Sequence, residues 1–275
     1  MCQLLGMNCN VPTDICFSFT GFQKRGGVTD VHADGWGIAF FEDRGVRLFL
    51  DPLPSAQSPI AELVRNYPIR SLNVIAHIRK ATQGLVTLEN THPFQRELWG
   101  RYWIFAHNGD LPQFLPELVG GFVPVGNTDS ERIFCWLLQS LRERFGATMP
   151  AREVLFNALH ELSMPLAAMG IFNFLLSNGD SLFAHCSTEL SYIVRHAPFN
   201  VAHLKDEDVL IDFSEVTTPD DRVAVIATQP LTDNEPWIVM PSGSLWMFHE
   251  GAAIAQRLTI PSPVKSLQAA AHFSG

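Results

Sequence analysis

Two consecutive helical segments stand between two groups of strand-like segments, and this order restricts the fold of the chain more than any other feature. Residues 130–146, SERIFCWLLQSLRERFG, place their apolar side chains on one helical face, and Thr128 or Asp129 is suited to cap this helix. Residues 150–163, PAREVLFNALHELS, predict a second helix with Pro150 in its first turn. The order does not match the strand–helix alternation of a doubly wound parallel sheet. We therefore expect an α+β protein with mostly antiparallel sheets and helices packed outside them.

Strand signals fill most of the remaining chain. Before the two helices we expect strands or hairpins at 2–7, 35–50, 72–82 and 101–109, and a short helix at 14–27 that ends at Gly26. After them we expect a hairpin at 170–186 with Asn178-Gly179 in its turn, then strands at 190–196, 221–229, 235–240 and 244–248. Residues 252–275 read as a tail. No repeat or long linker divides the chain, so we expect a single domain over 1–275.

Charge and cysteine content narrow the functional classes. The formal net charge of −9 argues against nonspecific binding to nucleic acid or anionic lipid, and no apolar run approaches the ~20 residues needed to span a bilayer. The N-terminus has no basic segment followed by a long apolar stretch, as a signal peptide would. Five cysteines without a CxxC pair, and histidines without HxH or HExxH spacing, suggest neither a disulfide framework nor a metal site. The sequence predicts a cytoplasmic protein without metal or other cofactor.

Four short stretches contain polar residues that packing alone does not require. They are HADGWGIAF (32–40), AHIRKATQG (76–84), FAHNGDL (105–111) and GNTDSE (126–131). Each has an ordinary structural explanation: a turn before a strand, a surface ion pair of Arg79, an Asn-Gly turn, and a helix cap by Asp129. Each also has a chemical one, because an asparagine amide beside a glycine N–H can bind an oxyanion, and an acid can bind an ammonium group.

Taken together and in order, these stretches resemble the class II glutamine amidotransferases, whose glutaminase domains are N-terminal-nucleophile hydrolases. The resemblance runs through MCQLLG, HADGWGIA, IAHIRKATQG, NTHPF, AHNGDL and NTDSERI, and is strongest to the stand-alone branch of the family. It implies a four-layer α/β/β/α sandwich with two mostly antiparallel sheets. It also implies removal of Met1, so that Cys2 becomes the first residue.

The resemblance assigns roles to individual residues. Cys2 becomes the nucleophile, and its freed α-amine becomes the general base; an ordinary α-amine pKa of ~7.7–8 suits that task at neutral pH. Asn108 and Gly109 become the oxyanion hole. The substrate-binding residues follow from the same match: Arg79 for the α-carboxylate, Asp129 for the α-ammonium, and Thr82 and His92 for the pocket walls.

The implied reaction is hydrolysis of the γ-amide of glutamine through a Cys2 γ-glutamyl thioester, giving glutamate and ammonia. One alternative is a γ-glutamyl hydrolase that acts on a γ-glutamyl peptide, thiol or amine; another is a non-catalytic glutamine sensor or scaffold. The partner is a small-molecule substrate, with a separate synthase subunit as a possible ammonia acceptor. Two positions depart from the common family pattern: Lys80 stands where many members have an aromatic residue, and Gln83 where many have histidine.

Overall fold

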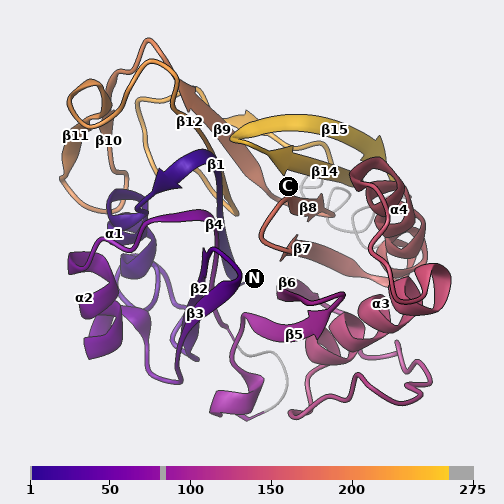
Figure 1. Ribbon diagram of the computed structural model, residues 1–275. Helices are drawn as coiled ribbons and strands as arrows, with labels where there is room; N and C mark the ends of the chain where they lie inside the picture. The colour runs from indigo at the N-terminus through magenta and orange to yellow at the C-terminus, as the bar shows by residue number, and fades with distance from the viewer. Residues whose placement is uncertain (1, 81–84, 260–275) are drawn as a thin grey trace, which may run out of the picture.

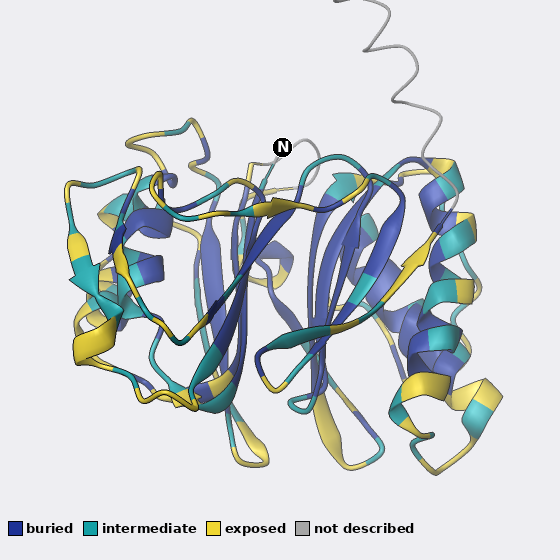
Figure 2. Cartoon of the chain, turned by 90° about the horizontal axis from the view of Figure 1, so that it is seen from above, coloured by how far each residue is buried: buried dark blue, intermediate teal, exposed yellow. Residues whose placement is uncertain are grey.

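Two β-sheets pack face to face in the computed structural model, and helices cover the outer face of each sheet (Figure 1). The structure describes residues 2–80 and 85–259. Viewed from above, the buried strands form the two central layers, and the helices on both flanks turn their exposed faces outward (Figure 2). The predicted four-layer α/β/β/α sandwich of the N-terminal-nucleophile hydrolases is confirmed.

The first sheet has the spatial order β13-β9-β12-β1-β4-β2-β3, and its recorded pairings are antiparallel. Its strands are β1 (Gln3–Thr13), β2 (Trp36–Glu42), β3 (Gly45–Asp51), β4 (Ser71–Ile78), β9 (Ser191–His196), β12 (Arg222–Ala227) and β13 (Ile238–Val239). In the register of β1 with β4, Gln3 lies opposite Ile78. The residues that flank this pair, Cys2 and Arg79, are therefore at the same end of the sheet.

The second sheet has the order β15-β14-β8-β7-β6-β5 and is also antiparallel. Its strands are β5 (Phe94–Leu98), β6 (Arg101–Asp110), β7 (Ile171–Ser177), β8 (Leu182–Cys186), β14 (Ser244–His249) and β15 (Ala252–Leu258). β5 begins at Phe94, opposite Phe105, so the residues of β6 after Phe105 pair only with β7 within the described chain. A small separate pair joins β10 (Val201–His203) to β11 (Leu210–Asp212).

The helices are divided between the two outer faces. α1 (Cys16–Lys24) and α2 (Pro59–Asn66) cover the first sheet, and α3 (Asp129–Phe145) and α4 (Arg152–Met169) cover the second (Figure 1). Short 3₁₀ turns lie at η1 (Ser55–Gln57), η2 (Leu88–Asn90) and η3 (Phe213–Glu215). None of the helices among the described residues is both long and apolar enough to cross a membrane.

Side chains alternate along the strands, and this alternation divides the apolar residues into three clusters. Leu4, Ile75 and Ala106 belong to the cluster between the two sheets. Leu5 belongs to the cluster under α1 and α2, and Phe105 to the cluster under α3 and α4. Because side chains two residues apart share a face, Cys2 follows Leu4 and Asn108 follows Ala106 toward the space between the sheets.

Most predicted elements are present, with some differences at their ends. Of the two residues predicted as the cap of α3, Thr128 caps it, because its hydroxyl accepts the N–H of Glu131. α4 starts at Arg152, so Pro150 lies before the helix rather than in its first turn. The predicted tail is wrong for Ala252–Leu258, which forms β15 beside β14; the rest of that segment, from 260 onward, lies outside the described residues.

Candidate active site

Cys2 and Asn108 meet across the space between the two sheets. The Oδ1 atom of Asn108 accepts the backbone N–H of Cys2 at 3.0 Å, and its Nδ2 atom donates to the Cys2 carbonyl at 2.6 Å. The Asn108 side chain is 2% exposed. A turn asparagine would face solvent, whereas this one fixes the start of the chain with both ends of its amide.

The Cys2 thiol is held by the first residues after β4. The backbone N–H of Lys80 donates to Sγ at 3.2 Å, and Sγ lies 3.4 Å from the Lys80 carbonyl oxygen. Burial raises the pKa of the Cys2 thiol, and the Lys80 N–H opposes this rise. The resting group is therefore the thiol rather than the thiolate, and a nucleophilic role requires a nearby base.

Gly109 follows Asn108 on β6 at a position that admits no side chain. A Cβ atom there would lie 1.8 Å from the carbonyl oxygen of Ile171 and 2.4 Å from Nε2 of His107. The close approach of β7 therefore requires glycine, so the Asn-Gly pair is part of a strand and not the turn that its composition alone suggests.

Arg79 is buried at the end of β4 although its guanidinium carries a permanent charge. Its backbone N–H donates to Gly35 at 2.8 Å, and its carbonyl accepts the N–H of Asp34 at 3.2 Å. Its Nη1 atom donates to the Leu85 carbonyl at 3.0 Å. Asp34 and Gly35 of the HADGWG stretch therefore bind the backbone of Arg79, and the Leu85 carbonyl binds its guanidinium.

Asp129 connects the start of α3 to the end of β6. Its Oδ2 atom accepts the N–H of Leu111 at 2.7 Å, and Oδ1 accepts the N–H of Ser130 at 2.8 Å. Burial, followed by the charge of Asp129, raises the pKa of the neighbouring Asp110. The negative charge of Asp129 thus acts on Asp110, and this local negative potential favours a cation.

His92 lies below the surface rather than at it. It is 4% exposed, and its ring centroid is 4.4 Å from those of His77 and Phe94. Burial lowers the pKa of His77 to about 3 and that of His92 well below its usual value, so both rings are neutral. His92 is therefore a buried, neutral ring that packs between His77 and Phe94. Thr82 and Gln83 lie outside the described residues.

The structure also brings in residues that the sequence patterns did not indicate. The backbone N–H of Lys80 contacts the thiol, and a backbone donor leaves no signature in residue type. His77 shares the face of Ile75 between the two sheets, and a histidine within an apolar strand does not stand out in the sequence. Asn173 faces Asn108 from β7, and only the register of two strands 65 residues apart reveals it.

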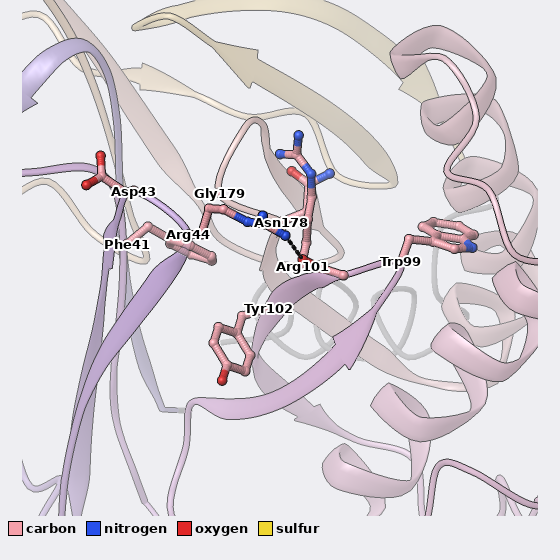
Figure 3. A pocket seen from close by; sticks show the side chains of 9 residues that line it. Phe41, Asp43, Arg44, Trp99, Arg101, Tyr102, Asn178 and Gly179 are labelled. Carbon is pink, nitrogen blue, oxygen red and sulfur yellow. Dashed lines mark hydrogen bonds between the residues drawn. The ribbon is translucent and has the colours of Figure 1, made fainter.

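A hollow of about 310 Å³ lies at the end of the sandwich opposite to Cys2 and Asn108 (Figure 3). The turns β2–β3, β5–β6 and β7–β8 form it, and Arg44 spans two of them by donating to the Gly100 carbonyl at 3.3 Å. None of the predicted site residues lines it. Within residues 2–80 and 85–259, no three His, Cys, Asp or Glu side chains are placed to hold a metal ion.

Comparisons with known proteins agree with this geometry. The family described as "Glutamine amidotransferases class-II" matches residues 1–272. The chain is 55% identical over 254 residues to "Putative glutamine amidotransferase YafJ" of Escherichia coli K12, covering 92% of this chain and all of that protein. It is 53% identical over 262 residues to a Haemophilus influenzae protein named in the same way, covering 95% of this chain and 88% of that one.

Solved structures show the same fold. A 2.0 Å crystal structure of a "predicted glutamine amidotransferase" from Pseudomonas aeruginosa is 47% identical, with a TM-score of 0.73 over 92% of this chain and 99% of that one. The glutamine phosphoribosylpyrophosphate amidotransferase of B. subtilis is 14% identical, with a TM-score of 0.54 over 93% of this chain and 49% of that one. The second likeness concerns the fold alone.

Proposed function

Because this chain belongs to the class II glutamine amidotransferases, we propose that it cleaves the γ-amide of glutamine with Cys2 as the nucleophile. The observation that carries the proposal is the pair of hydrogen bonds from the Asn108 amide to the backbone of Cys2. These two bonds bring the nitrogen of Cys2, its thiol and the amide of the buried Asn108 close together.

In the first step, the α-amine of a Cys2 freed from Met1 takes the thiol proton as Sγ attacks the substrate amide carbon. Once Met1 is removed, the contact from the Cys2 nitrogen to Asn108 Oδ1 engages one N–H of the new amine and leaves its lone pair to accept the proton. The carbonyl oxygen of the substrate becomes an oxyanion. The N–H of Gly109 and the Nδ2 of Asn108, once released from the Cys2 carbonyl, stabilise it.

In the second step, the C–N bond breaks, and the protonated α-amine gives its proton to the leaving nitrogen, which departs as ammonia. A γ-glutamyl thioester on Cys2 remains. The α-amine then takes a proton from water, the resulting hydroxide attacks the thioester carbon, and the C–S bond breaks. Glutamate leaves, and the thiol is restored.

Recognition of the glutamyl end is assigned to Arg79 and Asp129. A guanidinium binds a carboxylate with two parallel hydrogen bonds, and a carboxylate binds an ammonium group. The pair Asp110 and Asp129 supports the second assignment, since a bound cation relieves the repulsion that contributes to the raised pKa of Asp110.

The test compares two samples of the full chain, one with Met1 retained behind an N-terminal tag and one shown by intact mass to begin at Cys2. We expect glutamate release from glutamine only in the second sample, because an amide nitrogen has no available lone pair. Equal activity in both samples would overturn the N-terminal-nucleophile mechanism. A panel of γ-glutamyl peptides and amines, measured with the same sample, compares the leaving groups.

A further inference from the structure

We propose that Asn173 is a positioning residue for the oxyanion hole, an inference that rests on the proposed function. Asn173 lies on β7 directly opposite Asn108 and is fully buried. Its Nδ2 atom donates to the backbone carbonyl of Asn108 at 3.1 Å. Among the described residues, its side chain hydrogen-bonds to Asn108, Ser187 and Thr188 and to none of the residues assigned to substrate, so we expect its effect on the reaction to pass through Asn108 and Gly109.

The planarity of the peptide bond makes this contact matter for the next residue. The Asn108 carbonyl and the Gly109 N–H belong to one trans peptide unit, in which C=O and N–H point in opposite directions. A donor that fixes the direction of the carbonyl thereby fixes the direction of the N–H. The bond from Asn173 also polarises the peptide unit, which strengthens the opposite N–H as a donor.

The rest of the Asn173 amide is tied to the chain just after β8. Its Oδ1 atom accepts the N–H groups of Ser187 at 2.9 Å and Thr188 at 3.0 Å. Its Nδ2 atom also donates to the Thr188 hydroxyl at 2.7 Å. With four contacts the full hydrogen-bonding capacity of the amide is used, and rotation would leave buried groups unsatisfied. The side chain is therefore a fixed support for the Asn108–Gly109 peptide.

Asn173→Asp tests this support, because it keeps the shape and the acceptor for Ser187 and Thr188 but replaces the donor that faces Asn108. Asn73→Asp is the matched control. Asn73 is equally buried, contacts Asn8, and donates to the Gly179 carbonyl at 2.8 Å near the opposite end of the sandwich. Both variants lose one buried amide donor to a backbone carbonyl, and only one of those carbonyls is next to the site.

One readout needs no substrate. The sequence contains two Asn–Gly peptides, Asn108–Gly109 and Asn178–Gly179, so labelling with carbonyl-¹³C asparagine and ¹⁵N glycine selects two amide resonances. We expect Asn173→Asp to shift the Gly109 resonance, and Asn73→Asp to leave it in place. An unchanged Gly109 resonance in Asn173→Asp would overturn the proposed support.

The second readout is the split between kcat and KM for glutamine in the sample that begins at Cys2. We expect Asn173→Asp to lower kcat about 10–100-fold, because small misplacement of a reacting group has this cost. KM should change by less than about two-fold, since the oxyanion forms only in the transition state. Asn73→Asp should change neither constant per folded molecule. If Asn173→Asp does not fold, Asn173→Ser is measured in the same way.

Different results would contradict the proposed function and the role of Asn173. A wild-type sample that begins at Cys2 and releases no glutamate from any compound of the panel would overturn the proposed function. An active wild type together with an unchanged kcat in Asn173→Asp would overturn the role of Asn173 alone.

Discussion

At the scale of single residues, Asn108 carries two tasks that substitution can separate. Its Oδ1 atom accepts the Cys2 N–H, and its Nδ2 atom donates to the Cys2 carbonyl in the free protein. In the proposed reaction Nδ2 instead stabilises the oxyanion. Asn108→Asp keeps the acceptor but not the donor, and Asn108→Ala removes both.

We expect Asn108→Ala to lower kcat for glutamine by ~10²–10³, the usual cost of one oxyanion donor. Asn108→Asp should lose nearly as much, because only the donor acts on the oxyanion. Steady-state glutamate release measures both, and alkylation of Cys2 by iodoacetamide should remain possible in both. Normal kcat in Asn108→Asp would remove this amide from the oxyanion hole.

Recognition by charge gives a second expectation at this scale. In Arg79→Lys the ammonium group cannot form the two parallel hydrogen bonds that a guanidinium forms with a carboxylate. Asp129→Asn removes the negative charge that pairs with an ammonium group. Both should reduce kcat/KM for glutamine by at least about 10-fold, the equivalent of ~1.4 kcal/mol. The rate of Cys2 alkylation should be unaffected. If both variants hydrolyse glutamine normally, the glutamyl group is bound elsewhere.

At the scale of elements, the sequence predicts what depends on local pattern and not what depends on register. The helical period of α3 and the Asn-Gly turn after β7 are local, and both are found where expected. β15 was missed because an edge strand with exposed residues lacks clear alternation. In the candidate site, the motifs point to Cys2, Asn108 and Gly109, and the structure brings Cys2 and Asn108 into contact. The contacts of Asn173 and of the Lys80 N–H come from strand pairing and backbone direction, which residue types do not encode.

Glu131 shows how one element supports the site through another. It is 1% exposed in the first turn of α3, accepts the N–H groups of Val125 at 3.0 Å and Gly126 at 2.7 Å, and pairs with Arg96. We expect Glu131→Ala to lower the free energy of unfolding by about 3 kcal/mol, because it leaves the partly buried Arg96 without its carboxylate partner and two backbone N–H groups without their acceptor. Urea unfolding measures the loss.

Glu131→Gln is the control for that measurement, since its single amide oxygen keeps an acceptor for one of the two loop N–H groups, those of Val125 and Gly126. It should lose clearly less stability than Glu131→Ala. Equal losses in the two variants would show that the loop contacts contribute little and that the charge of Glu131 dominates.

At the scale of the whole molecule, buried neutral histidines make stability depend on pH. Burial lowers the pKa of His77 to about 3 and that of His185 to about 4, and it lowers those of His92 and His107. The unfolded chain binds protons on these rings below about pH 6.5, whereas the folded chain does not. The free energy of unfolding is therefore highest above about pH 6.5. It falls as the pH falls toward 4, because protonation of these rings stabilises the unfolded chain.

We expect the free energy of unfolding to fall between pH 6.5 and 4 with a slope of up to ~1.4 kcal/mol per pH unit for each such histidine. Urea unfolding at a series of pH values measures the slope. In His185→Asn the slope should decrease by up to ~1.4 kcal/mol per pH unit, because the asparagine side chain binds no proton when the protein unfolds. A slope that is flat in the wild type, or the same in both proteins, would contradict this account.

The pairing of β1 between β4 and β12 has a consequence for the timing of biosynthesis. The strand that follows Cys2 leaves the ribosome first, but its partner β12 is made only when translation reaches residues 222–227. At 5–20 residues per second, that partner is roughly 10–40 s behind. One edge of β1 stays unpaired for this time. An aminopeptidase that acts on nascent chains can therefore reach Met1 before the two sheets are complete. The removal of Met1 that the proposed mechanism requires thus has time to occur before the site is assembled.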